Sequence, residues 1–275
     1  MYWSRVKTIL IFLFLFLDIV LAGFIWVTDF DEMEIARVEI EDTVAVLQKN
    51  GIEISADIIQ DKRESLGIVE IETVWANREM FAKNFLGDEY KTTGESTFEN
   101  DGGKLYVNER EFLYNTNIHT ISMPDGNVAQ KELEKINIDI DAEKGEMSGG
   151  RLKFLQEIDG KSIFETGIYV KTANGKLAEV SGYWLLTEEE EKAAKKNPEL
   201  LTSITGVLIS FVENPIYDRN GDKIVSIETG YSTGDILPDT THKLVSVVPA
   251  YKITLQNGDF AMYGAINGEL LYNSR

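Results

Sequence analysis

The residue types that carry out most enzyme chemistry are sparse in this sequence. The two histidines, His119 and His242, lack the spaced histidine, cysteine or carboxylate partners that would hold zinc or iron. The chain contains no cysteine, so thiol catalysis is excluded. No G-x-S-x-G motif, phosphate-binding P-loop or dinucleotide-binding glycine pattern occurs. We therefore predict a protein that is not an enzyme and that uses no cofactor.

The acidic residues do not form a recognisable metal site either. The stretch from Asp218 to Asp222 resembles a calcium loop, but an EF-hand needs glycine at its sixth position and Gly221 is fourth. We predict a hairpin turn there. The 46 acidic residues against 27 basic ones give a formal net charge of -19, which disfavours binding to nucleic acid.

One carboxylate lies in unusual surroundings. Asp18 is close to the middle of an apolar run, residues 6–27, which as a helix would be about 33 Å long, enough to cross a hydrocarbon core of about 30 Å. Arg5 and Lys7 precede the run and acidic residues follow it, so the positive-inside rule predicts a cytoplasmic N-terminus and an extracellular remainder. A cleaved signal peptide is the competing interpretation, but its apolar part is normally about 7–15 residues long.

An aspartate at the bilayer midplane costs about 2.5–3.5 kcal/mol on insertion scales. We predict that Asp18 bonds to a polar group of a partner helix, and that the small residues Ala22 and Gly23, one turn further on, let that helix come close. The alternative is that the hydrophobicity of the run carries one carboxyl group without any partner.

The residues beyond this anchor predict an α+β class with two exterior domains, each of antiparallel sheet with helices on one face. The predicted bounds are 1–28 for the tail and transmembrane helix, 29–120 for the first domain and 121–275 for the second. Hairpin turns are predicted at Asp159-Gly160 and Asn174-Gly175. Helices are predicted over 32–48, 78–86, 128–136 and 199–212, and strands include 91–98, 104–114, 136–140, 150–158, 162–172, 176–186, 223–231, 243–248 and 251–255. An exterior protein without disulfides fits a bacterial envelope.

The N-terminus combines a set of residues, followed by a helix that ends in KNGIEI: Trp3, Arg5, Lys7, Thr8, Ile9 and Asp18. In these residues it resembles the N-terminus of the YycI (WalI) family. Tyr2 departs from the acidic or polar residue usual at that position. The segment Val248–Ile253 and the turns Asn257-Gly258 and Asn267-Gly268 are similar to the closing hairpin of YycI and YycH proteins.

The resemblance implies a single-pass membrane protein of Gram-positive bacteria with YycH/YycI-like exterior domains. Such proteins act with a YycH-like partner on the sensor histidine kinase WalK (YycG) of a two-component system, which controls cell-wall metabolism. Their membrane helix is implicated in contact with the helices of the kinase. The sign of the regulation, the external signal and the oligomeric state remain open.

A tethered PepSY-like binding module is the rival hypothesis. Its exterior domain would capture a wall fragment, a peptide or a protease, in a groove lined by aromatic residues such as Trp75, Tyr183 and Trp184. Such residues more often belong to a hydrophobic core.

Overall fold

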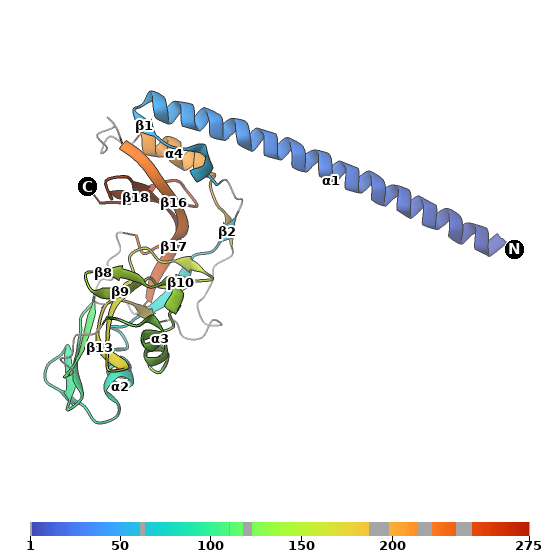
Figure 1. Ribbon diagram of the computed structural model, residues 1–275. Helices are drawn as coiled ribbons and strands as arrows, with labels where there is room; N and C mark the ends of the chain where they lie inside the picture. The colour runs from blue at the N-terminus through green and yellow to red at the C-terminus, as the bar shows by residue number, and fades with distance from the viewer. Residues whose placement is uncertain are drawn as a thin grey trace. The chain divides into compact units, whose positions relative to one another are not determined.

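The computed structural model describes residues 2–60, 64–109, 111–117, 123–186, 198–213, 222–234 and 244–274 (Figure 1). Within its first helix, the described side chains are those of Lys7, of residues 10–21 and of residues 37–49. The chain groups into two compact units, Met1–Lys62 with Ser203–Ile224, and Arg63–Thr202 with Val225–Arg275. These bounds differ from those of the predicted domains, because each unit combines two separate stretches of chain.

The first unit is built on one long helix, α1 (Tyr2–Lys49). Its 48 residues correspond to a length of about 72 Å. We predicted two helical stretches, 6–27 and 32–48, and the structure joins them because no proline or glycine lies between them to end the first. Gly51 follows the helix with φ 79°, a conformation in which glycine is favoured, as its position in the sequence predicted. Among the residues that the structure describes, no helix is both long and apolar enough to cross a membrane.

The rest of the first unit gathers near the C-terminal end of α1 (Figure 1). It consists of β1 (Ile52–Glu53), η1 (Ala56–Ile58), α4 (Ile204–Glu213) and the start of β16 (Asp222–Ser232), which pairs in parallel with β1. The predicted helix 199–212 was too long at its start, because residues 199–200 form a strand instead.

The second unit contains an eight-stranded sheet in which all described neighbours are antiparallel. Its order is β4 (Lys91–Thr92), β5 (Thr97–Asn100), β6 (Gly103–Val107), β7 (Phe112–Thr116), β13 (Lys176–Tyr183), β12 (Gly167–Ala173), β9 (Arg151–Phe154) and β8 (Glu146–Ser148). The β7–β13 pairing joins the two predicted domains in one sheet.

Two helices, α2 (Arg78–Leu86) and α3 (Gly126–Glu134), cover one face of this sheet. Phe81 of α2 is fully buried, and its ring meets the rings of Phe85 and Phe112 edge-on, both at 4.9 Å between centroids. Leu133 of α3 is fully buried in the same cluster. The α+β class, with antiparallel sheet and helices on one face, is thus confirmed for this part of the chain.

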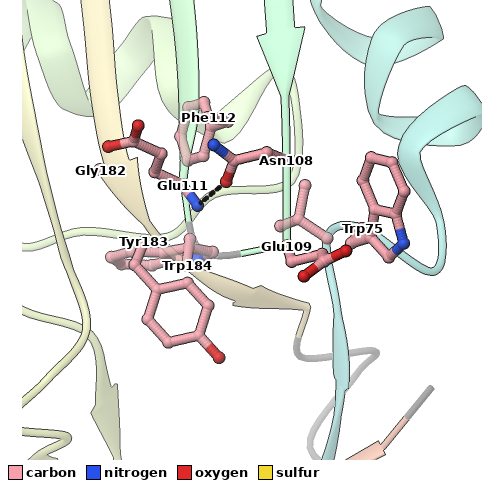
Figure 2. A pocket seen from close by; sticks show the side chains of 9 residues that line it. Trp75, Asn108, Glu109, Glu111, Phe112, Gly182, Tyr183 and Trp184 are labelled. Carbon is pink, nitrogen blue, oxygen red and sulfur yellow. Dashed lines mark hydrogen bonds between the residues drawn. The ribbon is translucent and has the colours of Figure 1, made fainter. Parts of the chain in front are cut away.

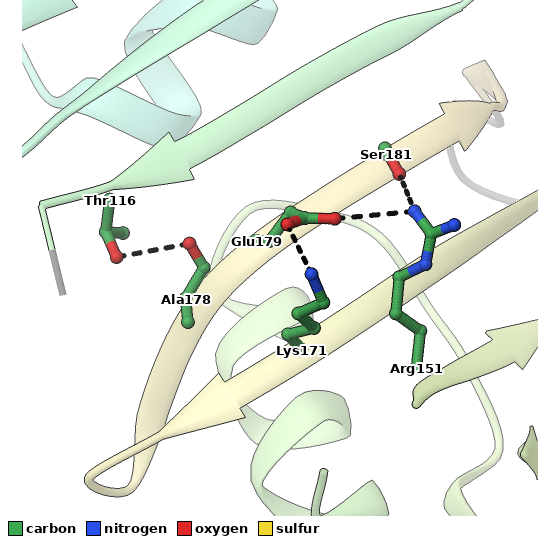
Figure 3. A network of polar contacts seen from close by, with 6 residues as sticks. All are labelled: Thr116, Arg151, Lys171, Ala178, Glu179 and Ser181. Atoms are coloured by element: carbon green, nitrogen blue, oxygen red, sulfur yellow. Dashed lines mark hydrogen bonds and ion pairs between the residues drawn. The ribbon is translucent and has the colours of Figure 1, made fainter. Parts of the chain in front are cut away.

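The other face of the sheet carries polar side chains. Glu179 accepts from Lys171 at 2.8 Å and from Arg151 at 3.4 Å, and Arg151 also lies 3.5 Å from the Ser181 hydroxyl (Figure 3). The Arg151 guanidinium lies 4.9 Å from the centroid of the Tyr169 ring. This alternation of apolar and polar residues is typical of a sheet that is packed on one face only.

A second sheet of this unit is centred on β17 (Leu244–Leu255). Antiparallel to β17 are β3 (Val69–Thr73) and β18 (Phe260–Gly264), while β14 (Leu185–Leu186) pairs with β3 and β19 (Leu270–Asn273) with β18. β16 is the other neighbour of β17. Two further pairs are antiparallel: β2 (Ser65–Leu66) with β15 (Glu199–Leu200), and β10 (Glu157–Ile158) with β11 (Lys161–Ser162).

Several local predictions were wrong. The predicted strands 91–98, 150–158 and 162–172 are each interrupted, and two other segments differ more. The alternating segment 136–140 is not a strand: its three isoleucines are buried against the core without joining a sheet. The predicted strand 104–114 is broken at residues 108–111, because the Asn108 side chain accepts from the Glu111 N–H at 2.7 Å and turns the chain back. That turn creates the β6–β7 hairpin.

Candidate functional site

The N-terminal half of α1 exposes a continuous apolar surface. Eleven large apolar side chains between Leu10 and Leu21 are 50–68% exposed. Asp18 lies among them, is also exposed, and makes no hydrogen bond or ion pair with any other described residue. Soluble proteins rarely expose apolar patches of this extent, so the surface indicates contact with lipid or with another protein.

The other predicted residues of this segment lie on the same helix. Ala22 is four residues after Asp18 and therefore on the same side of α1, with Gly23 beside it. The Lys7 side chain is exposed, whereas the side chains of Arg5 and Ala22 fall outside the described set. Their predicted roles, in partner contact and in setting the topology, stay predictions.

A second candidate site is a small hollow in the second unit. Three segments that are distant in sequence meet there: the turn after β3, the β6–β7 loop and the end of β13 (Figure 2). The hollow is shallow and partly open to solvent, with room for about one water molecule. Pockets for drug-sized ligands have volumes of about 300–1,000 Å³, so this one cannot enclose a ligand of that kind. The lining residues are Val74, Trp75, Asn108, Glu109, Glu111, Phe112, Gly182, Tyr183 and Trp184.

The three aromatic residues proposed for a binding groove all line this hollow. Trp184 is 4% exposed and belongs to the core, as expected for most such residues. Trp75 and Tyr183 are only partly buried, and each packs against the edge of a hydrophobic cluster. The Arg78 guanidinium lies 4.5 Å from the centroid of the Trp75 ring, a cation–π contact.

The acidic residues of the hollow come from the β6–β7 loop. Glu109 is partly buried and Glu111 is exposed, and neither carboxylate makes a hydrogen bond or ion pair with a described residue. In Figure 2 the Glu109 carboxylate lies between Trp75 and Tyr183 in the view. The sequence analysis missed both residues, because it placed them inside one continuous strand.

Tyr183 joins the hollow to a buried polar cluster. Its hydroxyl is buried and has no hydrogen-bond partner among the described residues. Burial, with a smaller contribution from the charge of Glu165, raises the pKa of Tyr183 to about 12. The Glu165 carboxylate itself accepts from the Ser232 hydroxyl and, at 3.1 Å, from the Thr233 N–H. Burial raises the pKa of Glu165 above its usual value, although these two hydrogen bonds and Lys252 act in the opposite direction.

The remaining residues considered for chemistry lie mostly outside the described part of the chain. His119, His242 and residues 218–221 are in this group. The described residues contain no group of three or more histidine or acidic side chains that could hold a metal ion. The absence of an enzyme site therefore stays a prediction.

Comparisons with known proteins give a distant structural likeness. No protein-family model matches the sequence, and no curated protein matches it. The chain is similar to the crystal structure of YycH from Bacillus subtilis, with a TM-score of 0.40 and 13% sequence identity. The match covers 77% of this chain and 58% of the YycH chain. At that level the likeness assigns neither a family nor a function.

Proposed function

We propose that this chain is a membrane-anchored, non-enzymatic regulator of a sensor histidine kinase of the WalK (YycG) type, acting together with a YycH-like protein. The observation that carries the proposal is the apolar surface of α1 from Leu10 to Leu21, exposed around the single carboxylate of Asp18. The resemblance of residues 3–18 to the YycI family supports the choice of partner.

In this proposal residues 6–27 cross the cell membrane once, with Arg5 and Lys7 on the cytoplasmic side and both units outside. A kinase with two signalling states close in free energy responds to any neighbouring helix that packs better against one of them. A hydrogen bond from Asp18 to a polar group of the kinase helix contributes about 0.6–2 kcal/mol in a membrane. If only one signalling state of the kinase makes this bond, the equilibrium constant between the two states changes about three- to thirtyfold.

The test compares Asp18→Leu with Asp18→Asn in the full-length chain. Leucine removes the polar group and asparagine keeps hydrogen-bonding capacity, so we expect the first to lose the complex and the second to retain part of it. The measurements are recovery of the kinase and of the YycH-like protein from gently solubilised membranes, together with the phosphorylation level of the response regulator. Equal recovery and equal phosphorylation in wild type and Asp18→Leu would exclude the helix contact.

The second candidate function is a tethered binding module. The observation that favours it is the convergence of Trp75, Tyr183 and Trp184 on one hollow. The hollow has room for only about one water molecule, so a peptide would lie across its rim and against the Trp75 ring. Replacing Trp75 by leucine should then remove binding of the peptide while the Asp18-dependent complex persists.

A further inference from the structure

The long helix α1 joins the surface around Asp18 to the rest of the first unit without an interruption. All residues from Tyr2 to Lys49 are helical, and the sequence has neither glycine nor proline between Gly23 and Gly51. We propose that α1 is a rigid lever, whose C-terminal end fixes the direction that Asp18 faces about the helix axis. This inference rests on the proposed function and adds the way in which the exterior part acts on the membrane helix.

The C-terminal end of α1 is held by one face. Thr43 and Leu47, one turn apart, are 5% and 0% exposed, and Ile40 and Val44 on the same side are partly buried. The elements that contact α1 near this end are α4, β1 and η1 (Figure 1). The helix therefore cannot turn about its axis relative to these elements without unpacking that face.

The adjoining stretch of α1 stands free of such packing. The side chains of residues 37–39 and 41–42 are exposed. The ion pair from Arg37 to Glu41, at 3.5 Å, joins two successive turns of the helix there. Because these side chains are exposed, a rotation of the first unit passes to the N-terminal half through the hydrogen-bonded helix backbone itself.

The two ends of the lever face the same way. A helix turns by about 100° per residue, so the 25 residues from Asp18 to Thr43 and the 29 residues from Asp18 to Leu47 place these two side chains within about 20° of Asp18, one on each side. Asp18 is thus in line with the middle of the face by which α1 is held. A movement that turns this face turns Asp18 toward or away from a neighbouring membrane helix by the same angle.

A hinge between the apolar run and the first unit is the alternative arrangement. Thr28 and Asp29 are residue types that often begin helices, and Glu32 stands three residues after Asp29, as in a capping box. With a hinge there, the Asp18 face would swivel freely, and the exterior part could not set its direction. The structure favours the lever, because α1 runs through these residues as one helix.

The first experiment measures the rigidity of α1 and needs no kinase. The chain has no cysteine, so Phe12→Cys and Gln48→Cys, both at exposed positions, attach two spin labels and no others. The 36 residues between them make about ten full turns, which puts both labels on one side of the helix about 54 Å apart. We expect double electron–electron resonance on the detergent-solubilised full-length chain to give one narrow distance distribution near that value.

The matched control carries the same two labels and glycine at residues 28–31. Glycine is the weakest helix former apart from proline, so this control should give a broader distribution that extends to shorter distances. An equally broad distribution in the helix without the glycines would overturn the lever and establish the hinge.

The second experiment tests whether the angle of Asp18 matters. Two alanines inserted after Ala36 turn Asp18 by about 200° and lengthen the helix by about 3 Å, whereas four alanines turn it by about 40° and lengthen it by about 6 Å. We expect the shorter insertion to lose the kinase from the solubilised membranes, as Asp18→Leu does, and the longer insertion to retain most of it. With glycine at residues 28–31, the shorter insertion should have no effect. Equal recovery with two and with four alanines, whether high or low, would overturn the rotational role.

The outcomes distinguish this inference from the function on which it rests. If the wild type recovers no sensor kinase, the proposed function fails, while the distance distribution still decides whether α1 is rigid. If recovery of the kinase depends on Asp18 but the distribution is broad, the proposed function stands and the lever is excluded.

Discussion

The buried hydroxyl of Tyr183 gives a prediction about the stability of the fold. This hydroxyl is shielded from water and has no hydrogen-bond partner among the described residues. Tyr183→Phe deletes only that group and keeps the ring that lines the hollow. We therefore expect the variant to be more stable than the wild type.

The size of the effect follows from the burial. A buried polar group without a partner costs about 1–3 kcal/mol, and because the Tyr183 side chain is partly exposed we expect about 1 kcal/mol near neutral pH. The pKa of this phenol is about 12 in the fold against 10.0 in its ordinary state. Between these values the phenol of the unfolded chain loses its proton while that of the folded chain keeps it, so the wild type loses about 3 kcal/mol of stability at most as the pH rises through them. The stability of Tyr183→Phe relative to the wild type should therefore increase as the pH rises.

The assay is chemical denaturation of the detergent-solubilised chain, followed by tryptophan fluorescence near neutral pH and again at alkaline pH. Absorbance titration of the phenolates should show one tyrosine fewer at the high end of the range in Tyr183→Phe. Tyr106→Phe is the control, because Tyr106 is 39% exposed and its hydroxyl should matter by less than about 0.5 kcal/mol. If Tyr183→Phe instead loses 1 kcal/mol or more, the hydroxyl has a partner and the reasoning fails.

Four further changes test the packing and the polar contacts of the second unit, each by denaturation of the detergent-solubilised chain. Ser232→Ala removes a donor to the buried Glu165 carboxylate and should cost about 1.5–3 kcal/mol. Because burial raises the pKa of Glu165 from 4.5, the stability of the wild type relative to Glu165→Gln should fall as the pH rises above 4.5, and a rising difference would contradict the raised pKa. Phe81→Ala should cost about 3–5 kcal/mol and the neighbouring Met80→Ala, at an exposed position, less than about 0.5 kcal/mol; equal effects would contradict the core assignment. Gly182→Ala should cost about 3 kcal/mol or more, because φ is 146° and the added methyl group would overlap a backbone carbonyl of the adjacent strand, so an unchanged midpoint would refute that geometry.

Features that depend on local chemistry could be predicted from the sequence. Asp159-Gly160 and Asn174-Gly175 were placed in two-residue hairpin turns, and all four residues have the positive φ that such turns require. The helix 78–86 has the predicted bounds and ends at Gly87, also with positive φ. Asn77 precedes that helix, in the position of an N-cap, but makes no capping bond, since its side chain donates to Glu72 instead, at 2.6 Å.

Features that depend on distant segments could not be predicted. The alternation in residues 136–140 has the period of a strand, but a strand also needs a neighbour with free backbone groups, and the sequence does not show whether one is there. The candidate hollow could not be predicted from the sequence for a similar reason. Trp75 and Tyr183 were singled out as aromatic residues, but their approach to Glu109 depends on the order of the strands in the sheet.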